Sequence, residues 1–254
     1  MYSIVGIKSS PSEKGATNMQ NWKFTNISTS VKVLFTSYMI VIGIGYMMAF
    51  TQILFTHGMA DGKVGLSVDD IVYSYYGNRN GSLIENKLNG SMKENASDED
   101  RFKIIKWVRE GADEAQFDTV IKPVLENNCL GCHNAEMGLP DFSTFESVKH
   151  VSETDNGATF ASLTRVSHIH LFGIAFIFMF VGLIFSFTTG IPTWLKASAI
   201  AMPYISQVLD IASWWLTKFD PAFAWLVIFG GTGMAIAFAF MWVVSMYEMW
   251  IKKS

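Results

Sequence analysis

Three long stretches without a charged side chain constrain this sequence more than any other feature. Residues 33–60, 166–195 and 221–247 contain no Asp, Glu, Lys or Arg. About 20 helical residues suffice to cross a hydrocarbon core of roughly 30 Å. The chain is also 50% hydrophobic and only 16% charged, which is apolar for a soluble protein of this length. Each stretch is therefore predicted to be a transmembrane helix.

A fourth apolar stretch, residues 197–216, is interrupted by Pro203, Gln207 and Asp210 but is still long enough to span. We count it as a fourth helix. Asp210 stands near its middle, and an ionisable residue there serves as a proton relay, bonds a partner helix, or simply faces other protein segments. Gly230-Gly231-Thr232-Gly233 in the last stretch suits close helix packing.

The lysines predict the orientation of these helices. They dominate the N-terminal segment, the loop around Lys196 and the C-terminal tail, and cytoplasmic segments of membrane proteins carry such an excess. Both termini are then inside, and an even number of crossings agrees with this. The predicted division is a cytoplasmic tail (1–32), a first helix (33–60), an extracytoplasmic domain (61–165), three further helices (166–250) and a second tail (251–254).

The segment 61–165 is acidic, with 18 acidic and 11 basic residues, a net charge of −7 in a chain whose total is −3. This balance disfavours nucleic acid as a partner. It could steer a basic soluble partner, although an ordinary solvated surface has the same composition.

Local signals place short helices inside this segment. Ser67 and Ser97 each precede acidic residues at capping spacing, which predicts a helix ending near Gly77 and another ending near Gly111. Residues 115–127 place apolar side chains on one stripe and lead directly into Cys129.

Cys129-Leu130-Gly131-Cys132-His133 is a C-x-x-C-H motif and uses both cysteines of the chain. This pattern is typical of covalent c-type haem attachment. Two thiols at this spacing reach the two vinyl groups of the porphyrin, and the adjacent His ligates the iron axially. A zinc site would need further Cys or His ligands at suitable spacing, and the sequence has none evident.

The motif and its flanks resemble a known family. Residues 117–125, 129–133 and 138–148 are similar to the small monohaem cytochrome c domains of the planctomycete type, which occur in many bacterial membrane proteins. The resemblance covers about 45 residues. It implies a helix-rich fold around one haem, with Cys129 and Cys132 as thioether anchors and His133 as the proximal ligand.

The sequence leaves the sixth iron ligand open, because no Met-Pro pair follows the motif within the segment 61–165. The candidates are Met137, His150, His168 and His170. Met137 follows His133 too closely for the chain to pass around the porphyrin edge. His150 is better placed by distance, and its alternative role is that of a solvated surface histidine. The ligand matters because it tunes the reduction potential.

Three histidines are expected at one membrane edge: His57 at the outer end of the first helix, and His168 and His170 at the outer start of the second. Two histidines at matching depth can hold a b-type haem. The spacing of His168 and His170 turns them about 200° apart on a helix, so only one of them can face a given iron. The alternatives are a metal site, a ligand to haem c, or interfacial histidines at helix ends.

The resulting prediction is an all-α chain, with a four-helix transmembrane bundle and a helical cytochrome c domain inserted between the first and second helices. We expect a bacterial inner-membrane protein with its haem domain in the periplasm. It would relay electrons between a membrane partner and a soluble periplasmic carrier, within a larger complex. The rivals are a quinol-oxidising subunit with an added haem b and a structural subunit of a respiratory complex. A stand-alone enzyme fits less well.

Overall fold

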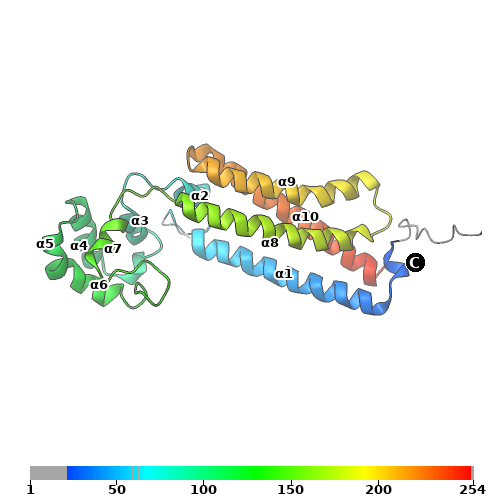
Figure 1. Ribbon diagram of the computed structural model, residues 1–254, viewed down its shortest axis with the longest axis horizontal. Coiled ribbons are helices and arrows are strands. Elements are labelled where there is room, and N and C mark those ends of the chain that lie inside the picture. The colour runs from blue at the N-terminus through cyan, green and yellow to red at the C-terminus, as the bar shows by residue number, and fades with distance from the viewer. Residues whose placement is uncertain (1–21, 59, 62, 64, 253–254) are drawn as a thin grey trace, which may run out of the picture.

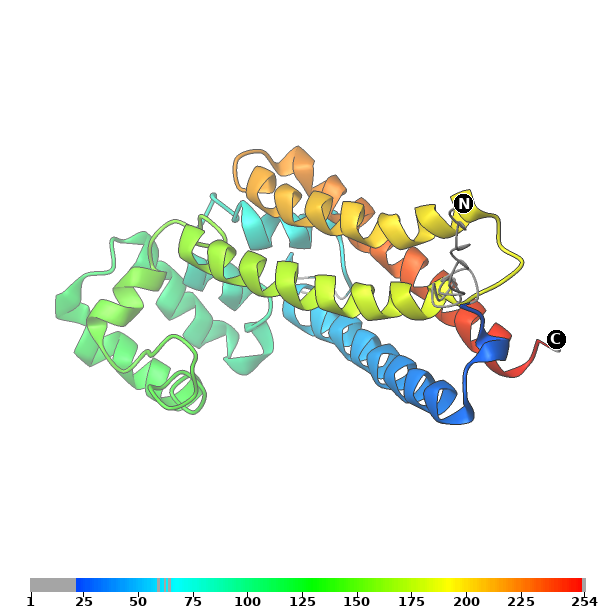
Figure 2. The same cartoon turned by 45° about the vertical axis from the view of Figure 1, so that its right-hand side comes forward.

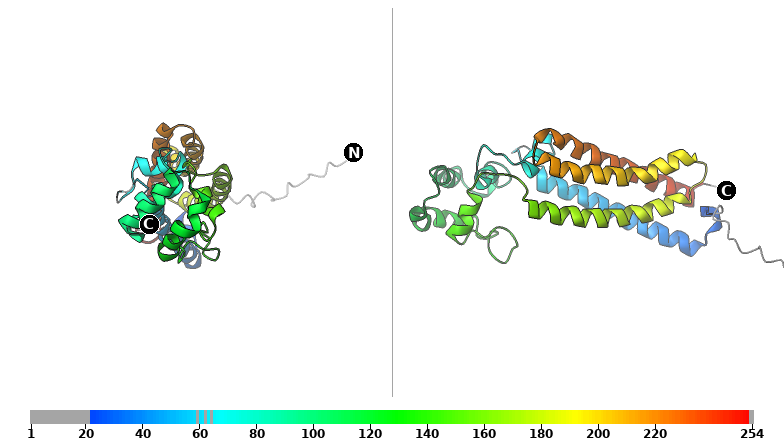
Figure 3. Two further views of the ribbon diagram at one scale, coloured as in Figure 1. Left: turned by 90° about the vertical axis from the view of Figure 1, so that its left-hand side faces the viewer. Right: turned by 45° about the horizontal axis from the view of Figure 1, so that its top comes forward.

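The computed structural model describes residues 22–58, 60–61, 63 and 65–252, and these residues form helices and loops. Within them, the only β-type pairing is one isolated bridge between Ser82 and Thr154. The all-α prediction is therefore confirmed. Most of the expected N-terminal tail (1–21) and residues 253–254 of the C-terminal tail lie outside the described residues. Long helices lie side by side, and a small domain of short helices lies beyond one end of them (Figures 1, 2 and 3).

The long helices are α1 (Thr29–His57), α8 (Phe160–Ser186), α9 (Thr193–Thr217) and α10 (Ala224–Trp250). In the described part of the chain, three helical stretches are long and apolar enough to cross a membrane: Thr29–Phe55, Phe160–Ser186 and Pro221–Trp250. These coincide with the three uncharged stretches of the sequence. The fourth helix, α9, has the length of a span but carries Lys196 and Asp210, and it packs along α8 and α10.

The long helices share one apolar core. Met39 of α1, Phe185 of α8 and Met241 of α10 are fully buried in it. The closest approach is between α9 and α10, where a Cβ atom added to Gly230 would lie 2.7 Å from Cβ of Asp210. One added to Gly233 would lie 2.5 Å from Oγ of Ser206. The expectation that this glycine-rich segment serves helix packing is thus confirmed.

Helix α1 begins and α10 ends at the bundle end farthest from the small domain (Figure 1), and Lys32 and Lys252 lie there. There the ammonium group of Lys32 donates to the carbonyl of Met249 (3.3 Å), and that of Lys252 pairs with Glu248 (3.0 Å). The short helix η2 (Phe24–Asn26) covers this end, with Phe24 stacked on Phe187 at 5.9 Å between ring centroids.

The small domain begins after α1 and is closed by the chain that returns to α8. Helix α2 (Val68–Tyr75) packs on the end of the bundle against α1, α9 and α10. The elements of the small domain are α3 (Leu83–Asn89), η3 (Lys93–Asn95), α4 (Asp98–Arg109), α5 (Glu114–Gln116), the π-helical turn η4 (Phe117–Ile121), α6 (Lys122–Asn128) and α7 (Phe145–Val151). Both predicted caps are confirmed: Ser67 accepts from the backbone N–H of Asp70 in a full capping box, and Ser97 accepts from that of Asp100.

One apolar core holds this domain together. Trp107 of α4, Phe117 and Ile121 of η4, Leu125 of α6 and Val148 of α7 are all buried in it. Pro123 lacks an N–H group and so interrupts the hydrogen-bond ladder of this helical segment. The π-helical turn just before it takes up about one extra residue. The apolar side chains predicted to form one stripe in residues 115–127 therefore still lie on one face. On α4 the buried positions are Ile104 and Trp107, whereas Phe102 is 65% exposed.

Candidate functional site

The C-x-x-C-H motif forms a tight turn at the C-terminal end of α6. The carbonyl oxygen of Leu125 accepts from the backbone N–H groups of both Cys129 (2.8 Å) and Leu130 (2.9 Å), which ends the helix. The carbonyl of Cys129 then accepts from the N–H groups of Cys132 (3.1 Å) and His133 (2.8 Å). These hydrogen bonds hold the backbone of Cys129, Cys132 and His133 in a single turn.

The two thiols lie in different surroundings, and no disulfide joins them. Cys129 is half-buried and packs against the domain core together with Leu130, whereas Cys132 is exposed. Burial raises the pKa of the Cys129 thiol, and the nearby carboxylate of Asp100 raises it further. The Cys129 thiol is therefore protonated at neutral pH, and only Cys132 is open to solvent.

The imidazole of His133 is held in one orientation by two contacts. Its Nδ1 lies 3.0 Å from the carbonyl oxygen of Pro140. A carbonyl only accepts, so Nδ1 must carry the proton, which leaves Nε2 as a bare acceptor. The ring also stacks on Phe142, with 4.3 Å between centroids and 2° between planes. The N–H of Phe142 donates to the backbone oxygen of His133 (3.0 Å), which fixes the pair.

These residues fit the donor set for c-type haem. Both thiols are free, and Nε2 of His133 has a free lone pair of the kind that ligates iron. The loop closed by the His133–Pro140 hydrogen bond exposes two large apolar side chains, Met137 (59% exposed) and Leu139 (49% exposed). A flat apolar ring bound beside the loop would cover such a surface.

His150 lies on α7 beside the buried Val148 and Val151, but its own side chain is 83% exposed. Its Nδ1 is 3.9 Å from a carboxylate oxygen of Glu153. The structure therefore presents His150 to solvent, and its role as sixth ligand stays a prediction.

The three histidines of the membrane edge have separate partners. Nδ1 of His57 lies 2.7 Å from Oγ of Ser74. Nδ1 of His170 lies 2.9 Å from the carbonyl of Val166 in its own helix, and its ring meets Trp214 edge-on. His168 is exposed beside Phe172. In the described ranges no group of three or more His, Cys, Asp or Glu side chains is arranged to hold a metal ion.

Asp210 faces protein rather than lipid. It is 8% exposed, packs against α10 at Gly230, and accepts a hydrogen bond from the indole N–H of Trp214 (3.2 Å). The adjacent Gln207 donates to the carbonyls of His170 (2.7 Å) and Leu171 (3.1 Å). The polar residues that weaken the fourth apolar stretch therefore hold α9 to its neighbours.

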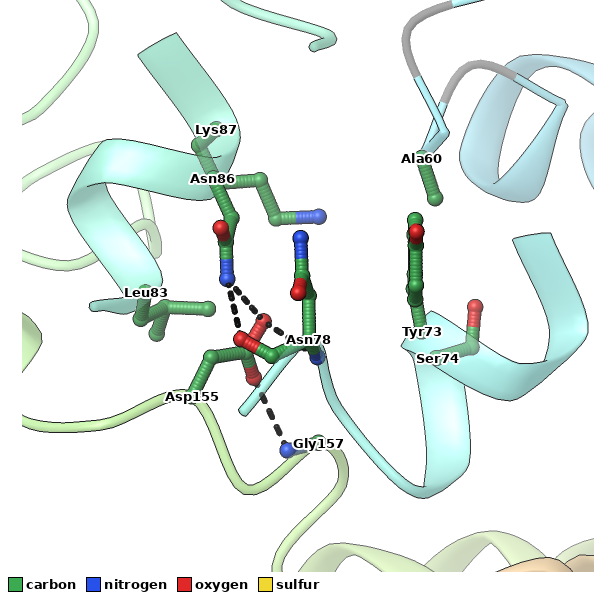
Figure 4. A pocket seen from close by; sticks show the side chains of 9 residues that line it. All are labelled: Ala60, Tyr73, Ser74, Asn78, Leu83, Asn86, Lys87, Asp155 and Gly157. Atoms are coloured by element: carbon green, nitrogen blue, oxygen red, sulfur yellow. Dashed lines mark hydrogen bonds between the residues drawn. The ribbon is translucent and has the colours of Figure 1, made fainter. Parts of the chain in front are cut away.

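A polar junction between the small domain and the bundle was not expected from the sequence. The buried carboxylate of Asp155 accepts from the backbone of Asn78 (3.4 Å), the side chain of Asn86 (3.0 Å) and the backbone of Gly157 (2.8 Å), as Figure 4 shows. Helix α3, which carries Asn86, was also missed, although Ser82 followed by Glu85 has capping spacing that could have predicted it.

A protein-family model described as a transmembrane helical domain matches residues 142–254, which include α7, α8, α9 and α10. The chain is a membrane protein with a transmembrane helical domain. No curated protein and no solved structure matches the chain. The family match includes α9, although this helix is less apolar than its neighbours. The match begins after the C-x-x-C-H motif, so it says nothing about that motif.

Proposed function

We propose that the protein is a membrane-bound c-type cytochrome that relays electrons between a membrane redox partner and periplasmic redox proteins. The observation that carries the proposal is the orientation of His133. The carbonyl of Pro140 fixes its tautomer and the ring of Phe142 fixes its plane, so Nε2 is bare beside two free thiols. Outer hydrogen bonds of this kind are typical of metal-ligating histidines.

Each residue of the motif has its own task in this proposal. Cys129, which is half-buried against the domain core, and Cys132, which is exposed, would hold the haem through thioether bonds. His133 would ligate the iron through Nε2, and Pro140 and Phe142 keep the imidazole from turning. When bound, the haem supplies an iron that accepts and returns one electron.

The membrane part of the proposal is a four-helix transmembrane bundle, with the small domain inserted between α1 and α8 on the periplasmic side of the inner membrane. Three observations support it. The lysines gather at the opposite end of the bundle, where a cytoplasmic face would carry them. The family match includes α9. Finally, α9 is as long as a span and packs along two candidate spans.

The relay is favoured over a subunit that also holds haem b. A b-type haem needs two imidazoles facing one another across its plane, and the membrane-edge histidines have separate partners: His57 bonds Ser74, and His170 bonds its own helix. We therefore propose one haem for each chain. We also propose further membrane subunits as partners, and the acidic small domain suits a basic soluble carrier.

Haem-stained denaturing electrophoresis of membranes tests the attachment. We expect Cys129→Ser and Cys132→Ser each to weaken the haem stain of the chain, and the double variant to abolish it. Ser143→Ala, an exposed change in the same part of the domain, is the matched control and keeps the full stain. Undiminished staining of the double variant, at equal protein in an immunoblot, would contradict the proposal.

A further inference from the structure

A small cavity lies where the small domain meets the end of α1. Its volume is about 110 Å³, and Tyr73, Ser74, Asn78, Leu83, Lys87 and Asp155 are among the residues that line it (Figure 4). Ala60, only three residues beyond the end of α1, forms part of its wall. The cavity therefore sits next to the end of a candidate span, where a membrane-dissolved molecule could reach it.

One side of the cavity carries hydrogen-bond donors. The ammonium of Lys87 and the side-chain amide of Asn78 lie on the same side of Tyr73, and all three residues line the cavity (Figure 4). Lys87 is exposed and makes no ion pair with any described residue. Both groups can donate to an oxygen atom of a bound molecule.

Ser74 offers the opposite kind of group. Its hydroxyl donates to the carbonyl of Asp70 (2.7 Å), so the proton is already used. Its oxygen also lies 2.7 Å from Nδ1 of His57, which must then be the donor. A hydroxyl whose proton is committed can only accept, so Ser74 suits the O–H group of a ligand.

The charges in the cavity favour a neutral ligand. The carboxylate of Asp155 is held by three donors, from Asn78, Asn86 and Gly157, and it offsets the charge of Lys87. The carboxylate of Asp155 would repel an anion, and the ammonium of Lys87 would repel a cation. Tyr73 and Leu83 add apolar wall. The cavity is smaller than the apolar cavity of about 150 Å³ that holds benzene, so it can take one edge of a six-membered ring, while the rest of the ring stays in the open mouth.

Helix α3, which lines the cavity, also contributes to the apolar core of the small domain. Leu83 and Lys87 of α3 face the cavity, whereas Ile84 and Leu88 of the same helix are buried in the core against which Cys129 packs. A ligand in the cavity is therefore separated from that core by a single helix, which is about 10 Å across with its side chains.

We propose that this cavity binds the headgroup of a membrane quinol, the electron donor of the relay. This inference rests on the proposed function. Ser74 accepts a hydrogen bond from one quinol hydroxyl, and Lys87 and Asn78 donate to the other oxygen. The quinol becomes the quinone and loses two electrons and two protons. The two electrons would pass to ferric haem held at Cys129, Cys132 and His133, one electron to each of two protein molecules, and the two protons would pass to water at the open mouth beside Lys87.

The test is stopped-flow reduction of the purified, full-length, haem-loaded protein by a short-chain benzoquinol. We compare wild type with Lys87→Gln, which removes the charged donor, and Ala60→Leu, which fills the cavity without removing a polar group. Lys93→Gln, at an exposed lysine of η3, is the matched control. We expect the half-saturating quinol concentration to rise about tenfold in Lys87→Gln, the effect of losing one charge-assisted hydrogen bond. Ala60→Leu should slow reduction similarly, and Lys93→Gln should match wild type.

Reduction by ascorbate separates this inference from the proposed function. The quinol site is supported if haem-loaded Lys87→Gln and Ala60→Leu are reduced by ascorbate at the wild-type rate but by quinol more slowly than wild type. Wild-type protein that ascorbate reduces but quinol does not, or equal quinol kinetics in all four proteins, overturns the site and leaves the relay standing. A phospholipid that copurifies with wild type and is lost in Lys87→Gln, without a change in quinol kinetics, also overturns it. Absence of haem from wild type would instead refute the proposed function.

Discussion

The contact between α9 and α10 makes two adjacent glycines behave differently on substitution. A Cβ atom at Gly230 would lie 2.7 Å from Cβ and 2.9 Å from Cα of Asp210, whereas one at Gly231 would meet no atom within 4 Å. Carbon atoms pack best at about 3.5–4.0 Å. Gly230→Ala therefore forces the two helices about 1 Å apart, because the atoms that it meets are at or next to the backbone and cannot rotate away.

Overpacking of this kind lowers the free energy of unfolding by about 1–3 kcal/mol. The neighbouring Gly231→Ala should instead be neutral or stabilise by up to about 1 kcal/mol, because alanine favours the helix more than glycine does. The two variants have the same composition and differ by one position, so each controls for the other.

Thermal unfolding of both purified proteins in detergent, followed by circular dichroism, measures the difference. We expect Gly230→Ala to melt below wild type and Gly231→Ala to melt at or above it. Equal melting temperatures, or a Gly230→Ala protein more stable than Gly231→Ala, would refute the packing argument.

Two further predictions concern the small domain and its side of the membrane. Asp155→Asn, which removes a carboxylate that accepts three hydrogen bonds, should lower the unfolding free energy by about 1–3 kcal/mol in thermal unfolding. The control variant is Asp118→Asn, at an exposed ion pair with Lys122, which should change the unfolding free energy by less than about 1 kcal/mol. An equal loss of unfolding free energy in the two variants would contradict the proposed importance of the junction. Protease added to sealed spheroplasts should cleave within residues 61–165 and leave epitopes at both termini intact; loss of either terminal epitope would reverse the topology.

Local signals in the sequence predicted much of the fold. Uncharged stretches identified three candidate spans because exclusion of charge is a strong and continuous requirement of the membrane. Ser67 and Ser97 predicted two helix starts because a cap depends only on residues within one turn. Helices α3 and α7 were missed because seven residues are too few to show a period, even though Ser82 and Thr144 cap them in the same way.

The candidate site was predicted in its residues but not in its geometry. The spacing of Cys129, Cys132 and His133 is visible in the sequence, whereas the bond from His133 to Pro140 depends on how the loop between them closes. The junction at Asp155 joins residues 69 and 77 positions apart. Such long-range contacts leave no periodic signal, and for the same reason the cavity beside Lys87 could not be expected.

The pyridine haemochrome spectrum of purified wild-type protein, made in cells that carry the haem-attachment machinery, tests haem attachment most directly. We expect the spectrum of c-type haem at one haem for each chain, retained after acid–acetone extraction because thioether bonds are covalent. We also expect no b-type component. Protein that lacks haem under these conditions, or whose haem is fully extracted, would contradict the central claim that Cys129, Cys132 and His133 attach a c-type haem.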